Sequence, residues 1–141
     1  MKRKIASSKL RSAAFTRTRA DHSRELAHDY CELIAELIDE KGEARGTDIA
    51  MRLGVSNATV AKTMKRLSDQ GLVEQEPYRA IFLSSDGWKL AEDGKRKHAI
   101  VEQFLLALGV SEKTAQADAE GVEHHVSDET LKAMAHYLAR N

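Results

Sequence analysis

The feature that most constrains the fold is a pair of amphipathic helical segments separated by three residues, Gly-Val-Ser at positions 54–56. The first segment covers residues 47–53, with Thr47 as its expected N-cap. The second begins at position 56 or 57 and ends at position 70, and the apolar residues on one of its faces are Val60, Met64 and Leu67. Two helices joined by a short turn that contains glycine are typical of a helix-turn-helix.

Two short β-prone runs follow the second helix directly. They cover residues 72–76 and 81–83, and residues 77–80 (Pro-Tyr-Arg-Ala) separate them. This spacing predicts a β-hairpin. Because the hairpin comes immediately after a helix-turn-helix, we expect a winged helix.

The rest of the chain is predicted to be helical. Apolar residues recur at helical spacing, and Ser or Asp residues precede three of the segments as N-cap candidates. The expected helices cover residues 24–40, 84–108, 111–125 and 127–139. We therefore expect a mainly α protein, with an N-terminal winged helix-turn-helix domain at 25–84 and a C-terminal helical domain at 85–141 that begins with a long linker helix.

The last predicted helix has an apolar stripe without an obvious partner in so short a C-terminal half. Its members are Leu131, Met134 and Leu138. Exposed apolar faces of this kind mark association surfaces. We therefore expect the C-terminal domain to form a homodimer.

Charge is distributed unevenly along the chain. Residues 1–24 contain eight basic residues and one acid, whereas residues 109–141 contain three basic and six acidic residues. A basic end of this kind suggests contact with a polyanion, although a solvated extension without a partner is the alternative. We expect residues 1–24 to be a flexible extension.

Composition excludes several classes of protein. The chain has no apolar run long enough to cross a membrane, and its N-terminus lacks the apolar core of a secretory signal, so we expect a cytoplasmic protein. One cysteine, Cys31, excludes an internal disulfide and a Cys-x-x-Cys zinc site. A metal site in this chain must therefore use His, Asp and Glu.

The second helix of the helix-turn-helix has the composition of a recognition helix. In such helices the first residues reach base edges, and cations farther along contact phosphates. The expected base-reading residues are Asn57, Ala58 and Thr59. The expected phosphate-contacting residues are Lys62, Lys65 and Arg66. Further expected DNA contacts are Ser56 and Thr63 on the same helix and Tyr78 and Arg79 on the wing. The alternative is a surface helix whose cations face solvent.

Acids and histidines fall at helical spacing in three places. The helix at 24–40 carries a polar row that consists of Glu25, Asp29, Glu32 and Glu36. A second group, at i, i+3 and i+4, consists of Glu120, Glu123 and His124, and His98 lies midway along the long helix. One interpretation is solvated acidic faces. The other is a divalent-cation site, in which oxygen and imidazole ligands suit manganese or ferrous iron better than copper or structural zinc.

The sequences that carry a family resemblance are Asp-Tyr-Cys-Glu at 29–32, residues 55–64, His98 with residues 101–106, and Asp-Ala-Glu-Gly-Val-Glu-His-His at 118–125. With them, residues 24–138 resemble the manganese transport regulators of the diphtheria-toxin-repressor family. The resemblance implies that the metal ligands are Asp29, Glu32, His98, Glu120, Glu123 and His124. Iron-sensing members have methionine and cysteine in place of Asp29 and Glu120, which favours manganese here.

The implied ligand set contains four carboxylates and two imidazoles, so two divalent cations per subunit would balance its charge. The resemblance implies a manganese-responsive repressor of manganese uptake genes, with Mn²⁺ as co-repressor and Fe²⁺, Co²⁺ or Zn²⁺ as substitutes. We expect operator DNA and a second copy of the chain as partners, without a membrane or a small-molecule substrate.

Three other functions are compatible with part of this pattern. An iron-responsive regulator of the same family uses the same architecture, and a winged-helix regulator that senses an organic ligand needs no metal. A small metallohydrolase is disfavoured because the chain lacks a His-Glu-x-x-His motif. We therefore expect a protein that is not an enzyme.

Overall fold

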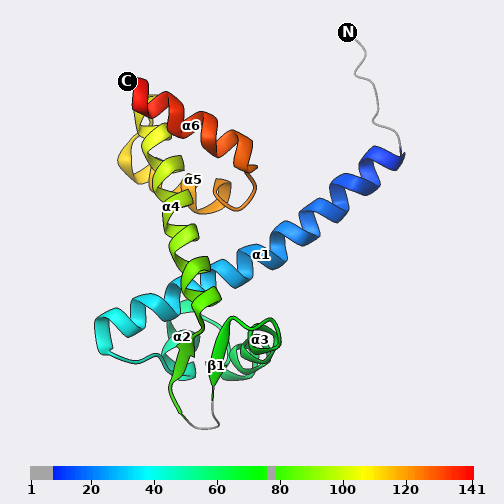
Figure 1. Ribbon diagram of the computed structural model, residues 1–141, viewed down its shortest axis with the longest axis vertical. Helices are drawn as coiled ribbons and strands as arrows, with labels where there is room; N and C mark the ends of the chain where they lie inside the picture. The colour runs from blue at the N-terminus through cyan, green and yellow to red at the C-terminus, as the bar shows by residue number, and fades with distance from the viewer. Residues whose placement is uncertain (1–7, 76–78) are drawn as a thin grey trace.

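The computed structural model describes residues 8–75 and 79–141, with the side chains of residues 14–21 left out. The described elements are α1 (Ser8–Lys41), α2 (Gly46–Leu53), α3 (Asn57–Asp69), β1 (Val73–Gln75), β2 (Ile81–Leu83), α4 (Ser85–Ala107), α5 (Glu112–Val122) and α6 (Asp128–Arg140). Helices α2 and α3 and the two strands pack around the C-terminal half of α1, and α4 rises from them to α5 and α6 (Figure 1). The mainly α architecture with a small hairpin confirms the predicted fold class.

The helix-turn-helix forms because its short turn satisfies both helix ends. Gly54 closes α2 with a left-handed backbone (φ 68°), a conformation that glycine adopts without a steric penalty. Ser56 caps α3, where its hydroxyl accepts a hydrogen bond from the Thr59 amide. The turn therefore fixes the orientation of α3 against α2.

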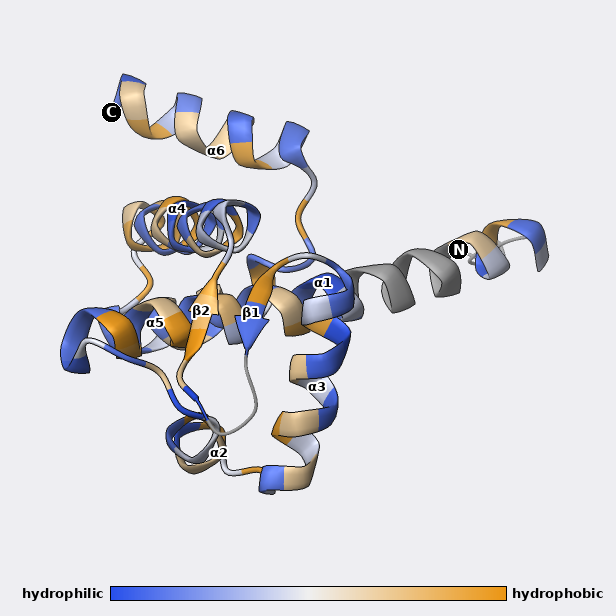
Figure 2. Ribbon diagram, turned by 60° about the horizontal axis from the view of Figure 1, so that its bottom comes forward, coloured by the Kyte–Doolittle hydropathy of each residue, from blue (hydrophilic) through white to orange (hydrophobic). Residues whose placement is uncertain are grey.

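The wing is a two-stranded antiparallel sheet in which Val73 pairs with Leu83 and Gln75 pairs with Ile81. Strand β2 is hydrophobic along its length (Figure 2), and Ile81 and Leu83 point into the core while Phe82 is exposed. This alternation ties the base of the hairpin to the domain. Residues 76–78, which contain the tip of the predicted hairpin, lie outside the described part of the chain.

A single hydrophobic core holds the N-terminal domain together. Its buried members come from every element of this domain, and the largest fully buried ones are Ile34, Leu37, Ile49, Met64, Leu67 and Ile81. Because Ile34 and Leu37 belong to α1, the acidic row on the opposite side of that helix is held in place by the core.

The C-terminal domain has a smaller core, in which Val101 of α4, Ala119 of α5 and Leu131 of α6 are buried together. Met134 packs against this cluster. The expectation that the stripe on the last helix has no partner within the chain is therefore wrong, because α4 covers much of it. Other large apolar side chains remain exposed in this domain, among them Leu108 and Val122.

Three predicted boundaries differ from the structure. Helix α1 begins at Ser8, so its N-terminal half continues through residues expected in a flexible extension and projects from the domain (Figure 1). Residues 8–24 lack Gly and Pro and are rich in Ala and Arg, which sustain a helix without an apolar stripe. Helix α2 begins at Gly46 and has Arg45 at its N-cap, two residues before the cap expected at Thr47. Helix α5 ends at Val122 instead of about His125.

Among the described helices, none combines the length and the apolar character that crossing a membrane requires.

Candidate metal centre and nucleic-acid interface

Helix α1 meets the turn after α5 through an acid and a histidine. Nε2 of His124 lies 3.3 Å from Oδ1 of Asp29, although the two residues are far apart in the sequence. The His124 side chain is nearly buried, and that of Asp29 is partly exposed. A contact between the two domains is therefore made by two side chains whose types, carboxylate and imidazole, are common metal ligands in proteins.

Glu123 lies between two histidines. Its Oε2 atom is 2.8 Å from Nδ1 of His98, and its Oε1 atom is 3.3 Å from Nε2 of His124. The Glu123 side chain is 2% exposed. Oε1 of Glu120, one turn earlier on α5, is 3.9 Å from the same His98 nitrogen. Helix α4 thus contributes His98 to the group formed by the end of α5.

Glu32 reaches this group from α1. Its Oε1 atom is buried and has no hydrogen-bond partner among the residues that the structure describes. Burial, followed by the charges of Glu123, Asp29 and Glu120, raises the pKa of Glu32 to about 7. An unpartnered oxygen of this kind is costly unless a proton or a cation satisfies it.

A glycine on α4 makes room for the Glu32 side chain. A Cβ atom on Gly94 would collide with Oε1 of Glu32, so the two helices approach closely here because Gly94 has no side chain. Gly94 lies inside α4, which nevertheless continues unbroken from Ser85 to Ala107. The glycine instead shapes the site.

The pKa values of two other residues of the site, Glu123 and His124, are also shifted. Burial raises the pKa of Glu123, against the neighbouring His98 and His124, which lower it. Burial alone would lower the pKa of His124, but its hydrogen bond to Asp29 and the nearby carboxylates outweigh burial, so this pKa lies above its usual value. All three raised pKa values mean that the cluster holds protons more readily than the same groups in water do.

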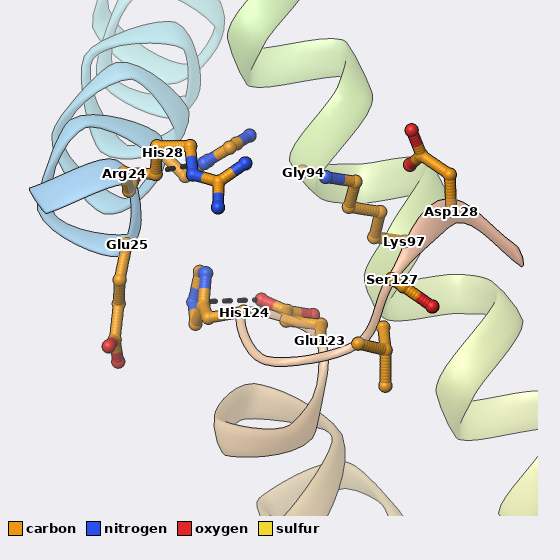
Figure 3. A pocket seen from close by; sticks show the side chains of 10 residues that line it. Arg24, Glu25, His28, Gly94, Lys97, Glu123, His124, Ser127 and Asp128 are labelled. Carbon is orange, nitrogen blue, oxygen red and sulfur yellow. Dashed lines mark hydrogen bonds and ion pairs between the residues drawn. The ribbon is translucent and has the colours of Figure 1, made fainter. Parts of the chain in front are cut away.

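The structure brings together all six residues that the resemblance implied as ligands. The donor set consists of carboxylate oxygens and imidazole nitrogens, and one of the oxygens is buried without a hydrogen-bond partner in the described part of the chain. Hard divalent cations favour such a set, so the residues fit a metal of this class. Glu123 and His124 face a cavity of about 230 Å³ between the domains (Figure 3).

Two more carboxylates lie beside the cluster and were not predicted as site residues. Oε2 of Glu102 is 3.1 Å from Nε2 of His98, and ligand-capable atoms of Glu25, Asp29 and His124 lie within 4.8 Å of one another. Helical spacing could have identified both carboxylates as neighbours of the predicted ligands. Glu102 follows His98 at i+4, and Glu25 precedes Asp29 at i−4.

The exposed face of α3 agrees with most of the predicted DNA contacts. Its exposed residues include Asn57, Ala58, Thr59, Lys62, Lys65 and Arg66. The capping residue Ser56 is exposed too, and its hydroxyl lies 2.9 Å from that of Thr59. The helix therefore presents small polar groups at its start and cations beyond them.

The other predicted DNA contacts are Thr63 on α3 and Tyr78 and Arg79 on the wing. Thr63 is buried, so the expectation that it faces DNA is wrong. It follows Val60 by three positions and precedes Leu67 by four, which places it on the apolar face. Arg79 on the wing is exposed, whereas Tyr78 lies outside the described residues.

The chain is similar to known proteins over both of its domains. Residues 24–81 match the domain described as iron dependent repressor, N-terminal DNA binding domain, and residues 84–140 match the iron dependent repressor metal binding and dimerisation domain. The transcriptional regulator MntR of Escherichia coli O6:H1 (strain CFT073) is 57% identical over 119 residues, which are 84% of this chain and 77% of that protein. The chain belongs to the iron-dependent repressor family. This confirms the resemblance to diphtheria-toxin-repressor regulators and to their MntR branch.

Solved structures of iron-dependent repressor relatives share the fold. The manganese regulator SloR has a TM-score of 0.70 and 28% identity, over 82% of this chain and 54% of that one. A manganese-dependent transcriptional repressor in complex with manganese has a TM-score of 0.71 and 30% identity, over 80% of this chain and 52% of that one. The chain thus spans about half the length of these two proteins. In the family's terms, α1–β2 form the DNA-binding domain and α4–α6 the metal-binding and dimerisation domain.

Proposed function

We propose that the chain is a manganese-responsive transcriptional repressor that binds operator DNA as a homodimer and controls manganese uptake genes, with metal as co-repressor. The observation that carries this proposal is the contact of His124 with Asp29, 3.3 Å between Nε2 and Oδ1, because it joins the metal-binding domain to the first helix of the DNA-binding domain. The names of the relatives, which are manganese regulators, support the choice of metal.

The proposed ligands are Asp29, Glu32, His98, Glu120, Glu123 and His124. Two divalent cations would neutralise their four carboxylates, and each bound cation would supply the positive charge that the cluster lacks. Glu123 would hold metal together with His98 and His124, because its two oxygens face these two histidines. Oε1 of Glu32 would then gain the partner that it lacks.

Coupling to DNA follows from where the ligands are attached. Asp29 and Glu32 belong to α1, which the core fixes to α3 and the wing, whereas the other ligands belong to the C-terminal domain. Repulsion among the uncompensated carboxylates favours looser domain orientations, and its removal favours one orientation. In a dimer, that orientation sets the separation of the two α3 helices, which must match successive major grooves.

The DNA contacts assigned in this proposal are the exposed residues Ser56, Asn57, Ala58, Thr59, Lys62, Lys65 and Arg66 on α3, and Arg79 on the wing. Asn57, Ala58 and Thr59 begin the helix, where side chains reach base edges. The cations farther along contact phosphates and set the register of the protein on the duplex.

Iron is the second candidate effector, because both matching domains are described as those of iron dependent repressors. The cluster, however, contains no sulfur: Cys31 is buried within the N-terminal core. Hard oxygen ligands at Asp29 and Glu120 favour manganese over metals that prefer softer ligands. Fe²⁺, Co²⁺ and Zn²⁺ remain substitutes to be compared with Mn²⁺.

The experiment is anaerobic operator binding, measured by fluorescence anisotropy with Mn²⁺, Fe²⁺, Co²⁺ or Zn²⁺ and without metal, on a duplex selected by the protein from a random pool. The proposal predicts tight binding with Mn²⁺ and weak binding without metal. A double variant, Asp29→Met with Glu120→Cys, should lose response to Mn²⁺ and respond relatively better to Fe²⁺ or Co²⁺. Operator binding that ignores every metal would contradict the proposal.

A further inference from the structure

A carboxylate outside the six proposed ligands stands at the edge of the cluster. Glu25 lies on α1 one turn before Asp29, and ligand-capable atoms of Glu25, Asp29 and His124 all lie within 4.8 Å of one another. The MntR resemblance does not include Glu25 among the implied ligands. Its position therefore needs an explanation of its own.

The placement of Glu25 follows from the helix. Positions 25 and 29 are four apart, so their side chains share a face of α1 and point toward the turn that carries His124. Figure 3 shows Glu25 on α1 across the cavity from His124 and Glu123. The Glu25 side chain is 28% exposed, which leaves its carboxylate partly shielded from water beside other acids.

Among the described residues, two histidines form ion pairs with the Glu25 carboxylate. Nδ1 of His22 and Nε2 of His125 each lie 3.8 Å from Oε2 of Glu25. Both contacts are longer than a good hydrogen bond. A divalent cation between Glu25, Asp29 and His124 would compensate the charge of the two carboxylates.

We propose that Glu25 is a further ligand of the cation held by Asp29 and His124. This inference rests on the proposed metal-binding function and adds a seventh ligand to it. Two carboxylates and one imidazole form a hard donor set that suits Mn²⁺ or Fe²⁺. Because Glu25 and Asp29 both belong to α1, the cation bound there is held mainly between the DNA-binding domain and the turn after α5.

The test is Mn²⁺ binding to the full chain, measured by isothermal titration calorimetry and by electron paramagnetic resonance. Glu25→Gln removes the charge and keeps the size of the side chain. We expect this substitution to lower the affinity for one of the two Mn²⁺ ions at least tenfold and to change the affinity for the other by less than twofold. Asp29→Asn should lower the affinity for the same ion. Glu36→Gln, which removes a charge from an exposed position on the same helix, should leave both ions unchanged.

Two outcomes overturn the inference. In the first, Glu25→Gln binds both ions with the wild-type affinities and spectrum. In the second, His125→Gln lowers the affinity for the same Mn²⁺ ion as Glu25→Gln does, which would mean that Glu25 acts by holding His125. We expect the Mn²⁺ affinities of His125→Gln to stay within twofold of those of the wild type. Wild-type protein that binds no Mn²⁺ would instead refute the proposed function itself, so the two failures are distinguishable.

Discussion

Nε2 of His124 lies 3.3 Å from Oδ1 of Asp29, and this pair joins the turn after α5 to the helix on which the DNA-binding domain is built. The core fixes Asp29 through its neighbours on α1, since Tyr30 and Ile34 are buried. A cation that held the Asp29 side chain would therefore be attached, through α1, to the DNA-binding domain. The proposed metal response depends on this mechanical link.

Because α1 approaches α4 closely at Gly94, we expect a larger residue at this position to weaken metal binding. In Gly94→Ala, the new methyl group collides with the Glu32 carboxylate, which must move away from the cluster. We expect Mn²⁺ affinity to fall at least tenfold in a calorimetric titration. Gly46→Ala is the control, because its methyl group would make an ordinary contact with Val60. Unchanged Mn²⁺ affinity in Gly94→Ala would contradict the assignment of Glu32 as a ligand.

The metal-free protein should lose stability as pH rises. The pKa of Glu32 is raised from 4.5 to about 7, so the folded chain holds a proton that the unfolded chain releases between these values. The raised pKa values of Glu123 and His124 act in the same direction. With an allowance for solvent screening, the free energy of unfolding should fall by about 1–2 kcal/mol between pH 5 and pH 7.5.

Urea unfolding at several pH values measures this slope. Glu32→Gln cannot ionise, so the variant should show a flatter dependence than the wild type. Saturating Mn²⁺ should reverse the sign for the wild type, because a carboxylate must be deprotonated to bind the ion. A metal-free protein that becomes more stable from pH 5 to pH 7.5 would contradict this account of the cluster.

Lys62 on α3 is expected to contact a phosphate. Lys62→Ala should weaken operator binding and reduce the slope of log affinity against log salt concentration by about one unit. Lys113→Ala removes an exposed cation from α5, in the other domain, and should leave the slope unchanged. Mn²⁺ affinity should stay the same in both variants. Equal salt slopes for Lys62→Ala and wild type would count against the assigned DNA-binding face.

The dimer should depend on exposed apolar side chains of the C-terminal domain. Leu108 is 59% exposed at the end of α4, so Leu108→Asp should cost little in folding yet place a charge in the interface. Analytical ultracentrifugation at micromolar concentration should show a dimer for the wild type and a shift toward monomer for the variant. Met51→Asp, at an exposed position on α2, should remain dimeric. A monomeric wild type would rule out the two-half-site mechanism.

Local patterns in the sequence predict the winged helix well. Gly54 and Ser56 specify the turn, and the apolar spacing of Val60, Met64 and Leu67 specifies the buried face of α3. The same spacing places Thr63 on that face, but its hydroxyl was interpreted as a DNA contact. Residue type alone misled there, because position along the helix decides burial.

The geometry of the cluster depends on tertiary contacts that no local pattern contains. The sequence spacing of Asp29 and His124 says nothing about their distance, which the packing of α1 against α4 determines. The role of Gly94 could not be predicted for the same reason. A glycine inside a helix indicates only lower helix stability, and its contact with Glu32 of another helix is visible only in the structure. The helix beyond residue 24 toward Ser8 was missed because it has no apolar periodicity.

The central claim is that metal and operator bind to coupled sites, and reciprocity tests it most directly. Mn²⁺ affinity is measured by equilibrium dialysis with and without saturating operator duplex. The account predicts that operator tightens Mn²⁺ binding by about 5–150-fold, the same factor by which Mn²⁺ tightens operator binding. Asp29→Asn should reduce this factor toward one. Mn²⁺ affinity that is identical with and without operator would contradict the account.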